Sequence, residues 1–228
     1  MKQRLLLTYA QLFMLASAQG FDGIAGLPEH TCDVSAEVLM TGITALSKEG
    51  LVREEGDSFV CTLTGAEIGR RLGGAKVFVT VRTRKRWLPD FSCFFGEELM
   101  ICAPSLYHSD KVSVSFVRTE ELIDMLADEG YIPGNEESFE PENGELERFE
   151  LRFWEQAAKG ALAEDGEIVF SMDAIGVSEK HLGSVRIVSY YSYRYLAEEF
   201  QGKIKRRQLM LPAVENALRR MLIQNDYC

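Results

Sequence analysis

The stretch ALSKEGLVREEGDSFVCTLTGAEIGRRL, from Ala45 to Leu72, is the part of this 228-residue sequence that best indicates a fold. Apolar residues at helical spacing over Ser35–Glu49 end at Gly50, two short strand patterns flank EEGD, and a second helical pattern follows. A helix, a hairpin and a helix in this order are typical of a winged-helix domain. In such a domain Ser35–Glu49 would be the recognition helix and REEGDS the wing.

The two elements that would touch DNA lack the side chains that contact it. The expected recognition helix offers Glu37, Thr41 and Ser47 with a single cation, Lys48, and the wing carries three acidic residues. DNA-binding proteins present Arg, Lys, Asn or Gln to bases and phosphates. The whole chain has 25 Lys and Arg against 35 Asp and Glu, a net charge of −10, which disfavours binding to nucleic acid. We therefore keep a degenerate winged-helix, DNA-binding transcription regulator as the alternative interpretation of the function and not as the main one.

The remaining sequence alternates helices with strands. AKVFVTVRT, FSCFF, ELMICAP and KVSVSFVRT predict four short strands that form an antiparallel meander, and TEELIDMLADEG predicts a helix after them. The second half repeats the order with a helix at ELERFELRFWEQ, a strand at EIVFSM, one long strand across SVRIVSYYSYRYL, a strand at KIKRRQLML and a helix opened by Pro212. We predict an α+β fold with a central antiparallel sheet flanked by helices, two pseudo-repeated halves and a winged-helix-like N-terminal segment.

Composition suggests where the halves meet. The segment PGNEESFEPENG, at 133–144, is acidic and rich in helix breakers. We expect an N-terminal half at 1–132, an acidic linker at 133–144 and a C-terminal half at 145–228, with a single compact domain as the other possibility.

The first twenty residues allow two interpretations. Lys2 and Arg4 before an apolar stretch, with Ala-Ser-Ala at 16–18, resemble a signal peptide. Thr8 and Gln11, however, form a capping box for a helix over 8–19. We expect the helix and a cytoplasmic protein, since no other run is long and apolar enough to span a membrane.

Residues that carry chemistry are sparse. Five cysteines include no CxxC pair, and the three histidines, His30, His108 and His181, have no ligand spacing. The sequence therefore predicts no metal site, no cofactor and no catalytic centre.

A tyrosine run and two basic runs are the candidates for a partner-binding surface. The tyrosines alternate on one face of the predicted long strand, where they either pack in the core or form a half-exposed contact face. The basic runs are either solvated, paired with the acidic linker, or docking sites for an acidic partner. The candidate residues are Tyr191, Tyr193, Tyr195, Arg84, Arg86, Trp87, Lys203 and Lys205.

The order of these segments resembles a known family. LLLTYAQLFMLASAQGFDGIAGLP resembles the leading helix and proline turn of the EspG family, chaperones of type VII secretion systems. LMTGITALSKEGLVREEGDSFVCTLTGAEIGRRL with the strands over Ala75–Val117 is similar to that family's first half, and GKIKRRQLMLPAVENALRRMLI to its end. The resemblance implies a central antiparallel sheet with pseudo-twofold halves and a non-catalytic cytosolic adaptor that holds helical secretion substrates. It implies no particular site residue.

Overall fold

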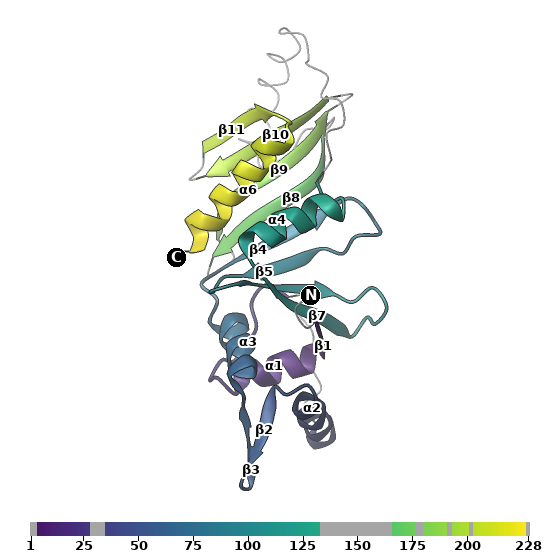
Figure 1. The fold of residues 1–228 in the computed structure, drawn as a ribbon, viewed down its shortest axis with the longest axis vertical. Helices are drawn as coiled ribbons and strands as arrows, with labels where there is room; N and C mark the ends of the chain where they lie inside the picture. Colours follow the sequence, from purple (N-terminus) through teal and green to yellow (C-terminus); the bar gives the residue numbers. More distant parts are fainter. Residues whose placement is uncertain are drawn as a thin grey trace.

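The computed structural model describes residues 4–27, 35–132, 166–176, 180–190, 193–200 and 203–226 (Figure 1). Its elements are β1 (Leu5–Thr8), α1 (Tyr9–Ser17), α2 (Ala36–Lys48), β2 (Val52–Glu55), β3 (Ser58–Cys61), α3 (Leu63–Gly74), β4 (Val77–Thr83), β5 (Phe91–Phe94), β6 (Leu99–Pro104), β7 (Lys111–Val117), α4 (Thr119–Asp128), β8 (Gly166–Gly176), β9 (His181–Tyr190), β10 (Tyr193–Phe200), β11 (Lys203–Gln208) and α6 (Leu211–Asp226).

Within the described ranges, nine strands form one antiparallel sheet in the order β1-β7-β6-β5-β4-β8-β9-β10-β11. Strand β4 pairs with β8 from Val77↔Gly176 to Thr83↔Phe170, so the strands of both halves share a single sheet. The hairpin β2-β3 stands apart from it. The predicted α+β class with a central antiparallel sheet is confirmed.

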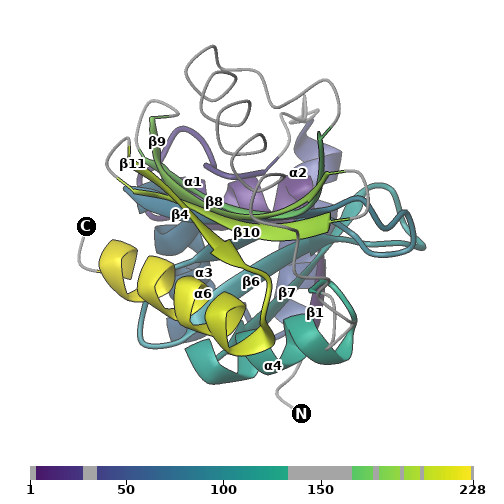
Figure 2. The same ribbon diagram turned by 90° about the horizontal axis from the view of Figure 1, so that it is seen from above.

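Helices cover both faces of this sheet. On one face, α4 and α6 lie on the same side of the curved sheet (Figure 2) and bury an apolar layer contributed mainly by β4, β5, β6, β8 and β9. On the other face, α1 and α3 cover β1, β7, β6 and β5 around Leu7, Leu12 and Leu72, all fully buried. Alternate residues of β7 therefore meet different surroundings, because successive side chains of a strand point to opposite faces.

Two glycines allow α3 to pack closely on its neighbours, Gly69 against α1 and Gly65 against the segment before β2. Gly65 and Gly69 lie one helical turn apart on α3, so they share a face. A Cβ at Gly65 would lie 2.0 Å from the carbonyl oxygen of Leu51, and one at Gly69 would lie 2.1 Å from that of Leu15. The helix therefore rests on backbone atoms where a larger residue would hold it away.

An ion-pair cluster fixes α6 to the sheet. Glu198 of β10 is 2 % exposed and pairs with Arg207 of β11 at 2.7 Å and with Arg220 of α6 at 2.6 Å. Two guanidinium groups offset the cost of burying one carboxylate. The cluster joins the last helix to the last two strands.

Most predicted elements are present, and the N-terminal caps are close to the prediction. Thr8 accepts a hydrogen bond from Gln11 N while the Gln11 side chain accepts one from Thr8 N, which confirms the capping box. The first helix ends at Ser17, two residues earlier than expected. Helix α3 is capped by Thr62, whose side-chain hydroxyl accepts a hydrogen bond from Gly65 N. The helix-hairpin-helix order of the opening stretch is confirmed.

Two predictions about strands were wrong. The residues before Thr8 form β1, which no pattern had indicated; Leu5 and Leu7 face the α1–α3 side, while Leu6 is 40 % exposed. The single long strand is two strands, since β9 ends at Tyr190 and pairs with Tyr193 at the start of β10. Apolar and aromatic residues continue through this hairpin, so periodicity alone did not reveal the turn. The acidic linker and the helix expected after it lie outside the described residues.

Candidate functional site

The strand register gathers several loops at one end of the sheet. Strand β4 ends at Thr83, β6 ends at Pro104 and β9 ends at Tyr190, and antiparallel pairing brings all three to the same end. The loops after β4 and β6, residues 84–90 and 105–110, project to the same side of the molecule (Figure 1). We call this end of the sheet the loop edge.

The loop edge presents large side chains to solvent. Trp87 is 69 % exposed in the first loop, and Leu106 and Tyr107 are 62 % and 90 % exposed in the second. Two strand spacings, roughly 10 Å, separate loops that follow β4 and β6. Arg84 and Arg86, also exposed, flank this apolar group. Trp, Tyr and Arg are the residues that most often carry binding energy at protein interfaces.

The predicted partner-binding residues lie in separate parts of the structure. Arg84, Arg86 and Trp87 lie on the loop edge, where Arg84 N donates to Val169 O at 3.2 Å. In the strand register of β10 and β11, Lys203 lies opposite Phe200 at the other end of the sheet, and Lys205 lies opposite Glu198 in mid-strand. The two basic runs therefore do not form one continuous patch.

The tyrosine run is also divided. Tyr191 lies outside the described residues, between β9 and β10, and Tyr193 begins β10. The ring of Tyr195 is only 3 % exposed, so it does not form a solvent-facing contact in this structure. The shared tyrosine face required a continuous strand, which the hairpin replaces. What the register does bring together is the Tyr190–Tyr193 hairpin and the Arg84–Trp87 loop, at one end of the sheet.

Sequence reasoning missed Leu106 and Tyr107. These residues lie in the segment SLYHSD, which connects β6 to β7. The signal was a pair of large apolar residues inside a turn of otherwise polar residues. Such a pair is exposed unless another element covers it, and only the tertiary structure shows that Trp87 lies at the same end.

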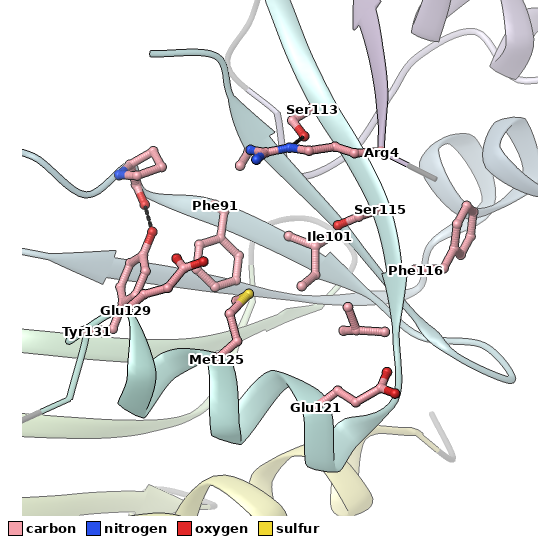
Figure 3. Close-up of a pocket in the computed structure, with 13 residues that line it drawn as sticks. Arg4, Phe91, Ile101, Ser113, Ser115, Phe116, Glu121, Met125, Glu129 and Tyr131 are labelled. Carbon is pink, nitrogen blue, oxygen red and sulfur yellow. Dashed lines mark hydrogen bonds between the residues drawn. The ribbon is translucent and has the colours of Figure 1, made fainter. Parts of the chain in front are cut away.

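A pocket of about 440 Å³ lies beside the loop edge, between α4 and strands β5, β6 and β7 (Figure 3). Its floor is apolar and is formed by Phe91, Ile101, Ala103 and Met125. Strand β7 contributes Ser113, Ser115, Phe116 and Val117 to the lining, and the small side chains of the two serines leave the space open. The volume and lining resemble those of small-molecule sites, which span roughly 300–1,000 Å³.

Charged groups stand around this pocket. Arg4 lies across one edge and donates to the Ser113 hydroxyl. Glu121 also lines the pocket, but its carboxylate accepts from the Arg118 side chain at 2.8 Å and 3.0 Å. Glu129 stands at the far edge near Tyr131. Burial, together with the nearby Glu129 and Asp90 carboxylates, raises the pKa of the Tyr131 phenol, whose hydroxyl donates to Pro89 O at 2.7 Å.

A second polar cluster lies near the middle of the sheet. Asp173 is 8 % exposed; it accepts from Ser171 Oγ at 2.8 Å and from Arg186 Nη2 at 3.1 Å. His181 Nε2 lies 3.7 Å from the same carboxylate. The aspartate already has an arginine and a hydroxyl as partners, so the arrangement is that of a structural ion pair.

The described thiols are poor nucleophiles. Cys93 and Cys102 are fully buried and Cys61 is partly buried; all three are free. Burial raises the pKa of the Cys102 thiol to about 12 and that of Cys93 still higher. A protonated thiol without access to solvent does not attack a substrate at neutral pH.

The described part of the chain shows neither a metal-binding cluster nor a membrane-spanning helix. Its residues include no group of three or more His, Cys, Asp or Glu side chains placed to hold a metal ion. None of its helices is both long enough and apolar enough to cross a membrane.

Comparison with known proteins supports the fold. No protein-family model matches the chain, and no curated protein matches it. A solved structure that does match is that of the Mycobacterium tuberculosis type VII secretion system chaperone EspG5 in complex with the PE25–PPE41 dimer. The superposition covers 95 % of each chain with a TM-score of 0.56 and 11 % sequence identity. At that identity the likeness establishes a shared fold, as the resemblance in sequence had predicted.

Proposed function

We propose that this protein is a non-catalytic cytosolic adaptor or chaperone that binds helical substrate proteins of a type VII secretion system. The observation that carries the proposal is the fold, which matches EspG5 over 95 % of both chains. Because the match spans nearly the whole of both molecules, the likeness is more than one common motif. EspG5 was solved with a protein dimer bound, and we infer a protein partner for this chain also.

The loop edge is our proposed docking surface. Trp87, Leu106 and Tyr107 offer three large apolar side chains, and Arg84 with Arg86 adds positive charge at one side. A chain of net charge −10 repels acidic proteins except where its own cations gather. A helix with an apolar stripe bordered by acidic residues would therefore complement this surface.

Capture from the native cytosol tests the proposal. The tagged protein is recovered at low and high salt, and bound protein and nucleic acid are both identified. We expect a small helical protein that stays bound at high salt, since apolar contacts are not screened. DNA recovered only at low salt, without a protein partner, would instead support the winged-helix alternative.

Substitutions at the loop edge then locate the interface. Replacing a central interface tryptophan by alanine costs about 2 kcal/mol or more, roughly a thirtyfold loss of affinity. We expect that loss for Trp87→Ala in calorimetric titration of the purified pair. Leu63→Ala is the control, because Leu63 is 88 % exposed at the start of α3, within the N-terminal group of helices. Equal affinity of wild type and Trp87→Ala would place the interface elsewhere.

A further inference from the structure

We propose that the pocket between α4 and β7 binds a small amphipathic carboxylate, with Arg4 contacting the carboxylate and the apolar floor holding a hydrocarbon group. This site adjoins the loop edge through Pro89 and would add a ligand to a protein for which only a protein partner is proposed above. Three observations support this proposal. The layer of helices has a gap over β7, the lining of the pocket is largely apolar, and the Arg4 guanidinium donates to a neutral hydroxyl.

The gap in the helical layer explains why the pocket exists. Helices α6 and α4 lie side by side on one face of the sheet (Figure 2) and cover the strands from β10 to β6. Strands β7 and β1 lie beyond α4. On this face β7 presents Ser113, Ser115 and Val117, and β1 presents Leu6. Leu6 remains 40 % exposed. The described elements therefore leave a space over β7 that is bounded by α4 on one side.

The lining suits a hydrocarbon group of moderate size. Phe91, Ile101 and Ala103 are 5 to 8 % exposed and line the pocket. Figure 3 shows Phe91 and Ile101 on the sheet with Met125 of α4 beside them. Water in contact with such a floor is displaced favourably by an apolar group. The volume of about 440 Å³ accommodates a medium-length chain or an aromatic ring with a short substituent.

The guanidinium of Arg4 supplies the polar contact. Among the described residues, its hydrogen-bond partner is the neutral Ser113 hydroxyl, and no carboxylate lies within ion-pair distance. A guanidinium can donate two parallel N–H bonds to one carboxylate, which makes it the preferred partner of that group. Ser115, two residues along the same strand, adds a hydroxyl donor on the same side of the pocket.

The other charges determine which end of the pocket takes the carboxylate. Glu121 is already bonded to Arg118, and Glu129 stands at the far edge near Tyr131. A ligand carboxylate near Glu129 would be repelled, whereas one near Arg4 would be attracted. The ligand therefore lies with its carboxylate toward β1 and its apolar part toward α4.

Titration with decanoate, with decanol as the neutral analogue, tests the proposal by calorimetry. We expect saturable one-to-one binding of decanoate to the full chain. Arg4→Met should weaken decanoate about tenfold, as expected for the loss of a hydrogen bond to a charged group, and leave decanol unchanged. Arg53→Met is the control, since Arg53 is an exposed cation on β2. Absence of saturable binding, or equal decanoate affinity in Arg4→Met, would overturn the proposal.

A second measurement needs no substitution. In protein labelled at the methyl groups of Ile, Ala and Met, decanoate should shift the NMR signals of Ile101, Ala103 and Met125. The methyl groups of Ile68 and Ala16, which lie on the opposite side of the sheet, should not move. Shifts spread over both sets, or confined to the second, would refute this pocket as the site.

Discussion

Replacing Gly69 by alanine is the sharpest test of how the N-terminal helices pack. Alanine is about 1 kcal/mol more favourable than glycine inside a helix, so propensity alone predicts that Gly69→Ala stabilises the protein. The structure predicts the opposite. A Cβ at this position lies 2.1 Å from the carbonyl oxygen of Leu15, where real Cβ contacts essentially never fall below 3.0 Å.

The expected loss of stability depends on which atoms the new Cβ would displace. The contact must lengthen by about 0.9 Å to reach even 3.0 Å, and the obstacle is backbone of α1 rather than a flexible side chain. Overpacking of this kind costs about 1–3 kcal/mol. We therefore expect Gly69→Ala to lower the free energy of unfolding by about 1–3 kcal/mol, with a fall of several degrees in Tm.

Urea unfolding followed by circular dichroism measures the effect, and Gly42→Ala is the matched control. Gly42 is also a helical glycine, on α2, but a Cβ there meets the sulfur of Met14 at 2.8 Å, and that flexible side chain can turn away. We expect the control to be neutral or stabilising by up to about 1 kcal/mol. A Gly69→Ala protein as stable as wild type, with an unchanged m-value, would refute the close packing of α1 on α3.

Two further predictions concern stability. Arg220→Met should lower the free energy of unfolding by about 1–3 kcal/mol, since it removes one partner of the buried Glu198 carboxylate. Arg219→Met should change the free energy of unfolding by less than about 0.5 kcal/mol, because the ion pair of Arg219 with Glu120 is exposed. The midpoints of urea unfolding measure both effects. For Cys102, the folded state keeps a proton that the unfolded chain releases above its ordinary pKa of 9.0. The contribution of Cys102 to stability should be full below pH 9 and fall by about 1.4 kcal/mol per pH unit as the pH rises toward 12. Cys102→Ala should therefore reduce the slope of stability between pH 9 and 11 and leave the part due to Cys93.

Different results would contradict each of these predictions. Equal urea midpoints for the two arginine variants would mean that Arg220 does not hold α6 to the sheet through Glu198. A slope of stability against pH that is the same with and without the Cys102 thiol would mean that this thiol is accessible to solvent. Far-UV circular dichroism of each variant provides the control for correct folding.

Local patterns were enough to predict most elements of this fold. The capping box at Thr8 and the alternation in AKVFVTVRT each depend on residues a few positions apart, so their physical cause lies within the segment itself. The predicted meander from β4 to β7 was confirmed for the same reason.

Local patterns failed where long-range pairing decides the structure. Strand β1 has only four residues and exists because β7 supplies its hydrogen bonds, from Leu5↔Val114 to Thr8↔Lys111. The hairpin at Tyr190–Tyr193 interrupts a continuous apolar and aromatic run, and it forms because β10 fits between β9 and β11. The pairing of β1 with β7 joins residues roughly 100 positions apart, beyond any local window. The hairpin joins neighbouring strands, but the run YYSY at 190–193 contains no Gly or Pro that would mark a turn.

The sequence by itself determined most of the segments that become helices and strands, because propensity and capping act within a few residues. The tertiary structure decided which side chains meet. It brought Trp87 to the same sheet end as Tyr107, placed Lys203 at the other end, and set Arg4 over a pocket on the far side of β7. Register and layer packing are set by the whole sheet at once, so no stretch of sequence contains them.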